Sequence, residues 1–168
     1  DVLPARTMKD IDQVYWMLEA SKKGYKTVII DTVSILQEFA TKEVLVEDGK
    51  DEETAGQWGS MTKRHWGEVS SKLKSMIHRF RDLEMHVIFI AQDRTFSGDG
   101  EEGEEGQIAP EVGPRLMPSV ASVMNAAVDF IGNTFVREQV STIKIGTKKK
   151  TKSKIQYSMR IGPHASYI

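Results

Sequence analysis

The chain has 168 residues, of which 39% are hydrophobic and 28% are charged, and its formal net charge is −1. This composition is typical of one globular domain, here residues 1–168, and the small net charge excludes a general electrostatic attraction to nucleic acids or membranes. The lack of cysteine excludes disulfides, thiolate catalysis and thiolate zinc sites. Because no apolar run approaches the roughly 20 residues of a membrane span and we find no signal peptide, we expect a cytoplasmic protein with no membrane partner.

The first predicted element is a helix that begins after Thr7. Thr7 and Asp10 have the spacing of a capping box, in which the two residues bond each other's main-chain N–H groups. Apolar residues then recur at helical spacing, and Gly24 is a natural terminator of the helix. The apolar positions are Ile11, Val14, Tyr15 and Leu18.

The next segments alternate between strands and helices. Residues 25–31, "YKTVIID", form a predicted strand whose unbroken apolar run indicates that both of its faces are covered. We expect a short helix over 33–40, a loop over 41–57, a longer helix over roughly 60–83 and a second buried strand over 86–91. This order favours a parallel α/β sheet with right-handed crossovers. The expected buried stripe of the longer helix consists of Trp66, Val69, Leu73, Met76, Ile77 and Phe80.

The remaining segments differ in character from the first half. Residues 93–116 combine glycines with carboxylates, which predicts a mobile acidic loop. A short helix over 118–127 and a strand around 129–136 follow. Residues 141–161 indicate two strands joined by a lysine-rich turn, which is either a solvated hairpin tip or a contact for phosphate. The lysines of this region are Lys144, Lys148, Lys149, Lys150, Lys152 and Lys154.

Two predicted strands end in polar side chains. In an open α/β sheet, ligands bind beyond the carboxyl ends of the strands, where Asp31 and Gln92 are expected. A carboxylate directly after a buried strand is the Walker B pattern, in which it holds Mg²⁺, here through water, beside the phosphates of ATP. Thr32 and Ser34 are candidates to contact the hydrated ion or the carboxylate, and Gln92 to orient the attacking water or sense the γ-phosphate. The plain alternative for Asp31 is a strand that ends where polarity begins.

The phosphate-binding half of such a site is not apparent in this sequence. No G-x-x-x-x-G-K-[ST] motif occurs, and "DGK" at 48–50 lacks both the earlier glycine and the hydroxyl. In P-loop proteins the motif follows the first strand, upstream of Walker B. We therefore expect either that the N-terminal part of the domain is missing from this chain or that the nucleotide interpretation is wrong.

Several stretches together resemble a known family. They are "YKTVIIDTVSIL", "SMTKRHWGEVSSKLKSMIHRFRDLEMHVIFIAQDR", "AAVDFIG" and "RIGPHASYI". Over most of residues 7–168 the chain is similar to the RecA-like ATP-binding proteins of bacteriophages. The resemblance implies an α/β fold, a RecA-like P-loop NTPase core with a mostly parallel central sheet flanked by helices and a C-terminal β-hairpin. It also implies ATP and Mg²⁺ as cofactors, self-association into a ring or filament, and action on single-stranded DNA in recombination or annealing.

The resemblance also implies roles for particular residues. Asp31 takes the Walker B position and Gln92 the position of a glutamine that couples the γ-phosphate to a DNA-binding loop. Residues 93–116 match the second DNA-binding loop, and residues 40–59 the region of the first. The candidate DNA contacts are Arg94, Arg115, Lys148, Lys149 and Lys150. The candidates for a cation that reaches a neighbouring subunit's γ-phosphate are Lys148, Lys150 and Arg160.

Other interpretations stay open at this point. Without the Walker A loop and the upstream catalytic glutamate, the chain should hydrolyse ATP poorly, and carboxylates in 93–116 should oppose DNA binding. The alternatives are a non-catalytic RecA-like assembly or adaptor module with a degenerate nucleotide site, and an unrelated α/β enzyme of small-molecule metabolism. Lys63, Arg64 and His65 could meet an anion at a helix N-terminus, but we expect them to be solvated surface.

Overall fold

The computed structural model describes residues 1–20, 24–49, 61–96, 111–145 and 148–162. Four α-helices and six β-strands lie within these ranges. They belong to two compact units, one within Asp1–Val128 and one within Asp129–His164, and each is described by itself. Whether the whole chain acts as a single domain stays a prediction. None of the described helices combines the length and the apolar character that a membrane span requires.

The first helix, α1 (Met8–Ala20), begins as its sequence predicts. The Asp10 carboxylate accepts hydrogen bonds from the main-chain N–H groups of Arg6 and Thr7 at 2.8 and 2.9 Å. The Asp10 N–H in turn donates to Oγ1 of Thr7 at 3.2 Å. These bonds satisfy donors that would otherwise be orphaned in the first turn. Gly24 has a φ of +79°, which a glycine adopts without strain.

Two strands form the parallel part of the first unit. β1 (Thr27–Asp31) pairs with β2 (His86–Ile90), so that Thr27 lies opposite His86 and Asp31 opposite Ile90. Parallel pairing within the described ranges is confined to these two strands. The predicted mostly parallel central sheet is therefore present here as one strand pair.

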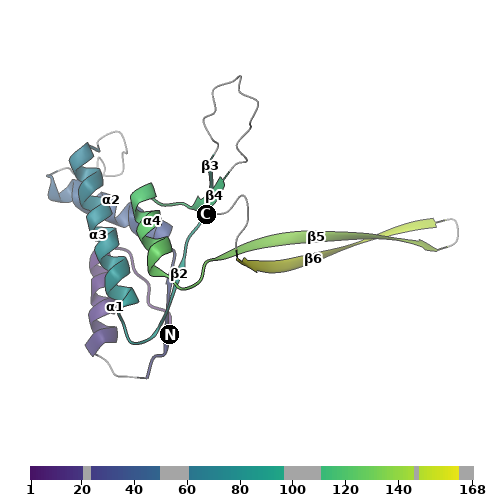
Figure 1. Cartoon of the computed structure of the whole chain (residues 1–168), viewed down its shortest axis with the longest axis horizontal. Helices are drawn as coiled ribbons and strands as arrows, with labels where there is room; N and C mark the ends of the chain where they lie inside the picture. The colour runs from purple at the N-terminus through teal and green to yellow at the C-terminus, as the bar shows by residue number, and fades with distance from the viewer. Residues whose placement is uncertain (21–23, 50–60, 97–110, 146–147, 163–168) are drawn as a thin grey trace, which may run out of the picture. The chain divides into compact units, whose positions relative to one another are not determined.

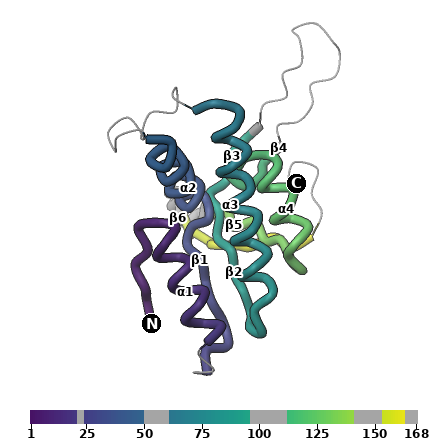
Figure 2. The backbone as a smooth tube through the Cα atoms, turned by 90° about the vertical axis from the view of Figure 1, so that its left-hand side faces the viewer, coloured from purple at the N-terminus to yellow at the C-terminus, as the bar shows by residue number. Residues whose placement is uncertain are grey.

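The prediction that both faces of the first strand are covered is wrong for the described residues. Ile30 is buried at 7% exposure, whereas its neighbour Ile29 is 57% exposed. Ile88 and Ile90 of β2 are 46% and 40% exposed, on the same face as Ile29 by the register. Successive side chains of a strand point to opposite faces, so the helices cover one face and leave the other open (Figure 2).

The helical layer is longer than the sequence predicted. α2 (Val33–Glu47) continues seven residues past the expected end at 40, so the loop prediction for 41–57 is wrong over 41–47. The reason is that Leu36, Ala40 and Val44, four residues apart, all bury against the core. Residues 50–57 of that predicted loop lie outside the described residues.

The long central helix is confirmed with slightly shorter bounds. α3 (Lys63–Arg81) packs between α2 and the last helix of this unit, α4 (Pro118–Ala127), which matches its predicted range (Figure 2). The predicted apolar stripe of α3 is buried except for Trp66, which is half-buried. Its fully buried members are Val69, Leu73, Met76, Ile77 and Phe80.

The predicted acidic loop has structured ends. β3 (Asp93–Phe96) and β4 (Glu111–Pro114) form an antiparallel pair, with Asp93 opposite Pro114 and Phe96 opposite Glu111. The prediction of a loop over the whole of 93–116 is therefore wrong at both ends, because the two flanks bond to each other. The carboxylates at 99–105 lie outside the described residues.

The second unit is one long antiparallel hairpin, β5 (Gly132–Ile145) and β6 (Lys148–Ile161) (Figure 1). The separate strand predicted around 129–136 is the first part of β5. Lys148, Lys149 and Lys150 belong to β6, so the prediction of a lysine-rich turn is wrong for these three residues. The register explains the difference, because cross-strand bonding extends to Ile145 and Lys148.

The register gives the hairpin two different faces, since cross-strand partners share a face. Val136 lies opposite Tyr157 and Thr134 opposite Met159, whereas Arg137 lies opposite Gln156. We call the first side the apolar face; its exposed apolar members are Val136, Val140, Ile155, Tyr157, Met159 and Ile161. We call the second side the polar face; it carries Asn133, Phe135, Arg137, Gln139, Lys154, Gln156, Ser158 and Arg160.

Candidate functional site

The carboxyl ends of β1 and β2 bring two predicted site residues to one edge of the strand pair. Asp31 is the last residue of β1 and lies opposite Ile90 in the parallel register. Gln92 follows two residues after Ile90, and both polar side chains are exposed. Because parallel strands point the same way, Asp31 and Gln92 leave the sheet at the same edge. This is the position at which open α/β sheets bind ligands.

The two hydroxyls that the sequence singled out lie at the start of α2. Thr32 is the N-cap, and its Oγ1 accepts a hydrogen bond from the Ile35 N–H at 3.3 Å. Ser34 is buried, and its Oγ accepts a bond from the main-chain N–H of Gln92 at 3.1 Å. Ser34 therefore joins the first turn of α2 to the end of β2. The N-terminus of α2, with its partial positive charge, directly follows Asp31.

Gln92 has a second partner, which the sequence did not suggest. The main-chain N–H of Arg115 donates to the carbonyl oxygen of Gln92 at 2.7 Å. The Nη1 atom of Arg115 donates to the side-chain Oε1 of Gln92 at 3.1 Å. Arg115 was predicted as a DNA contact, and no local pattern pairs it with a residue 23 positions away. The structure thus ties the residue after β4 to the end of β2.

Gln37 is a further residue at this junction that the sequence did not reveal. Its Oε1 atom accepts a hydrogen bond from the main-chain N–H of Met117 at 2.7 Å, and its side chain is buried. The hydroxyls of Ser70 on α3 and Ser119 on α4 lie 2.9 Å apart. These contacts hold the start of α4 against α2 and α3.

The oxygen ligands at the strand ends fit a magnesium ion that is shared with the phosphates of a nucleotide. No group of three or more histidine, aspartate or glutamate side chains that could enclose a metal occurs in the part of the chain that is described. Mg²⁺ is commonly bound by one or two carboxylates, several waters and the phosphates of a nucleotide. The exposed Asp31 carboxylate, with Thr32 beside it, suits such a shared ion and not an all-protein cage.

The other predicted site residues belong to the β3–β4 pair and its flank, or to the hairpin. Arg94 is in β3 opposite Gly113, so Arg94 and Arg115 flank the segment between β3 and β4. Lys148, Lys149, Lys150 and Arg160 belong to the hairpin unit. The guanidinium of Arg160 is 5.2 Å from the ring centre of Phe135, and that of Arg137 is 5.0 Å from it. Their roles in DNA or nucleotide contact stay predictions.

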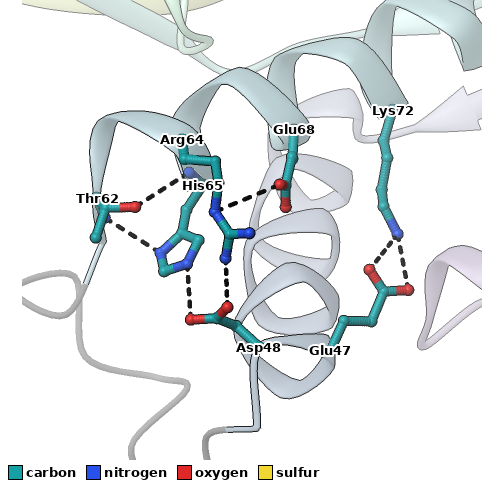
Figure 3. Close-up of polar contacts among 7 residues, drawn as sticks. All are labelled: Glu47, Asp48, Thr62, Arg64, His65, Glu68 and Lys72. Atoms are coloured by element: carbon teal, nitrogen blue, oxygen red, sulfur yellow. Dashed lines mark hydrogen bonds and ion pairs between the residues drawn. The ribbon is translucent and has the colours of Figure 1, made fainter.

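The expectation that His65 is solvated surface is wrong. His65 is 1% exposed, its Nδ1 accepts the Thr62 N–H at 3.2 Å, and its Nε2 lies 3.0 Å from Oδ2 of Asp48 (Figure 3). Since Nδ1 acts as an acceptor, the network assigns the ring proton to Nε2, which donates to Asp48. The T-x-x-H spacing of Thr62 and His65 was the one local signal for this arrangement, as a variant of the capping box.

The Asp48 carboxylate also pairs with Arg64. The chain itself therefore supplies the anion at the N-terminus of α3. Arg64 forms an ion pair with Asp48 and lies 3.7 Å from Glu68 (Figure 3). The hydrogen bond from His65, followed by that from Arg64, holds the pKa of Asp48 below its usual value. One turn further on, burial lowers the pKa of Lys72, but its contacts with Glu47 and Glu43 outweigh burial and raise it.

In P-loop NTPases, a strand-end carboxylate helps to hold Mg²⁺ beside the phosphates of the nucleotide. In this chain a carboxylate and an amide stand at the ends of a parallel strand pair that helices cover on one face. The comparison with protein families agrees: the AAA domain family matches residues 3–158, and the chain belongs to this family. No curated protein and no solved structure matches the chain. An AAA domain implies ATP with Mg²⁺ as its general ligands. The match does not single out bacteriophage or RecA-type proteins.

Proposed function

We propose that this AAA domain binds Mg²⁺ and ATP at the carboxyl ends of β1 and β2 and uses them, as a RecA-like protein, to act on single-stranded DNA. The observation that carries the proposal is the placement of Asp31 and Gln92 at the same edge of a parallel strand pair. In this assignment Asp31 holds the hydrated ion. Thr32, as the N-cap of α2, and Ser34, through its bond to Gln92, hold the backbone around that ion. Gln92 contacts the terminal phosphate.

The resemblance to the RecA-like proteins of bacteriophages supports a role in DNA recombination or single-strand annealing. The protein would self-associate into a ring or filament. A cation of one subunit, Lys148, Lys150 or Arg160, would then reach the nucleotide of the next. Arg94 and Arg115 would meet DNA beside β3 and β4.

The charge distribution of the hairpin supports a nucleic acid partner. Glu138 is the one carboxylate in residues 132–161, and its cross-strand partner Ile155 places it on the apolar face. The polar face carries Arg137, Lys154 and Arg160, and Lys148 and Lys150 occupy alternate positions of β6 in step with Lys154. Lysine and arginine that neutralise phosphates supply most of the nonspecific affinity for nucleic acids.

The test of the nucleotide site is the Asp31→Ala variant of the full-length protein. We expect ATP turnover to fall by about 10- to 100-fold, because loss of a group that acts on a bound metal ion through its water ligands typically costs that much. Asp129→Ala, which removes an exposed carboxylate outside the site, is the matched control. Circular dichroism checks that both variants stay folded. Unchanged turnover in Asp31→Ala would refute the assignment.

A second candidate function is a non-catalytic assembly or adaptor module with a degenerate nucleotide site. It is favoured by one sequence observation, namely that residues 1–168 contain no G-x-x-x-x-G-K-[ST] motif. Equilibrium binding of Mg²⁺ with ATP to the full-length protein separates the two candidates. Binding that Asp31→Ala weakens supports the ATPase, whereas self-association without any nucleotide binding supports the adaptor.

A further inference from the structure

Gln92 is held at almost every polar atom. Its main-chain N–H donates to Ser34 Oγ, its carbonyl oxygen accepts from the Arg115 N–H, and its side-chain Oε1 accepts from Arg115 Nη1. Among the residues that the structure describes, the carboxamide nitrogen is the polar group of Gln92 left without a hydrogen-bond partner. The side chain itself is exposed at the strand edge.

Arg115 is in turn fixed by its neighbours along the chain. Leu116 is buried at 3% exposure, and the Met117 N–H donates to the buried Gln37 side chain. The Arg115 main chain is itself bonded to Gln92 at 2.7 Å. Because the backbone is anchored at Arg115 itself and at the two residues that follow, the Arg115 side chain reaches Gln92 from a preorganised position.

The chemistry of the two side chains decides which end of the amide is used. A guanidinium has five N–H donors and no acceptor, so it can pair only with the oxygen of the carboxamide. This contact sets the orientation of the amide, with the oxygen toward Arg115 and the NH₂ group away from it. An NH₂ group donates, so it suits an anionic phosphate oxygen and does not suit the hydrogen atoms of an attacking water.

We propose that Arg115 is a positioning residue that turns the NH₂ group of Gln92 toward the nucleotide and thereby makes the site prefer a triphosphate over a diphosphate. The inference rests on the proposed function, since it takes the nucleotide to lie at the ends of β1 and β2. It goes further by giving Gln92 the role of a hydrogen-bond donor to the γ-phosphate, which only a triphosphate carries.

The experiment measures the dissociation constants of a non-hydrolysable ATP analogue and of ADP, each with Mg²⁺, by calorimetry on the full-length protein. Arg115→Met keeps the aliphatic stem and the main-chain bond to Gln92 but has no side-chain donor. We expect it to lower the preference for the triphosphate about tenfold, the usual effect of one hydrogen bond to a charged group, with the affinity for ADP unchanged. Gln92→Ala should have the same effect.

Two further variants test whether Arg115 acts through Gln92. The double variant Arg115→Met with Gln92→Ala should lose no more preference than Gln92→Ala alone. Arg115→Lys keeps a donor and should retain part of the preference. Arg81→Met, on an exposed arginine at the end of α3, is the matched control and should leave both affinities unchanged.

The outcomes separate this inference from the proposed function. If Arg115→Met keeps the wild-type ratio of the affinities for the ATP analogue and ADP, the role of Arg115 is overturned. The same holds if the losses of triphosphate preference add in the double variant. Either outcome leaves nucleotide binding in place. Equal loss of ATP and ADP affinity in Arg115→Met also overturns the role of Arg115, since a purely structural role would have that effect. A wild-type protein that binds neither nucleotide refutes the proposed function and the inference with it.

Discussion

The imidazole of His65 donates from Nε2 to the carboxylate of Asp48, and so joins the first turn of α3 to the C-cap of α2. The same ring accepts the Thr62 N–H through Nδ1. One buried side chain therefore accepts a main-chain N–H at the N-terminus of α3 and also bonds to the C-cap residue of α2. Asp48 and His65 lie on either side of residues 50–60 in the sequence, so this contact joins the two flanks of that segment.

The first prediction concerns the stability that His65 supplies. His65→Ala should lower the free energy of unfolding by about 2–4 kcal/mol, because it removes two hydrogen bonds and leaves a cavity. Urea denaturation followed by circular dichroism measures the change. His78→Ala, on an exposed position of the same helix, should change the free energy by less than about 0.5 kcal/mol. Equal effects of the two variants would mean that the buried contact does not form.

The second prediction concerns the pH dependence of the Asp48 contact. The pKa of Asp48 in the folded protein lies below its usual value of 3.8 because His65 and Arg64 donate to the carboxylate. A group with a depressed folded pKa stabilises the protein above its unfolded pKa, and this stability is lost as pH falls through the folded pKa. The destabilisation by Asp48→Asn should therefore be full near neutral pH and should shrink below 3.8.

Carbon-detected NMR titration of the Asp48 carboxyl group gives the direct measurement. Its midpoint should lie below 3.8 in the wild type and should rise in His65→Ala. A midpoint that does not move in His65→Ala would contradict the assigned cause. His78→Ala again serves as the control, since His78 is exposed.

The third prediction tests the open face of the β1–β2 pair. Ile30→Ala should cost about 2–5 kcal/mol of unfolding free energy, because Ile30 is buried in the core. Ile29→Thr, one residue earlier and 57% exposed, should cost less than about 1 kcal/mol. Denaturant unfolding of the two variants at the same protein concentration makes the comparison. A large cost at Ile29 would show that another part of the assembled protein covers this face.

The fourth prediction concerns the basic residues of the hairpin, on its polar face and at the start of β6. If these residues contact single-stranded DNA, the logarithm of the binding constant should fall linearly with the logarithm of salt concentration. Replacing Arg137 and Lys154 together by glutamine should lower that slope by about 1.4, and replacing Lys148, Lys149 and Lys150 by up to about 2. Fluorescence anisotropy measures the binding.

The control for this prediction is Lys9→Gln, which removes an exposed cation from α1. It should leave the salt slope unchanged. If the hairpin variants also keep the wild-type slope, the basic side of the hairpin is a solvated surface and DNA binding must be sought elsewhere.

Much of the local structure could be predicted because the responsible residues are near one another in the sequence. Thr7 and Asp10 cap α1 from three positions apart, and the buried stripe of α3 repeats at helical spacing. The polar strand ends at Asp31 and Gln92 were also visible, since an apolar run precedes each. The end of α2 was missed because its last two turns are mixed in composition, and burial of Val44 and Leu45 decides their state.

The sequence by itself determined the order of the four described helices and of β1 and β2, the helix start at Thr7, and the positions of Asp31 and Gln92 at strand ends. Each of these rests on short-range spacing and hydrophobic periodicity. Only the tertiary structure decided that His65 is buried against Asp48 and that Arg115 holds Gln92. It also decided that one face of the parallel pair is open. The physical reason is that hydrogen bonding and burial at these positions depend on partners 17 and 23 residues away, which folding alone brings together.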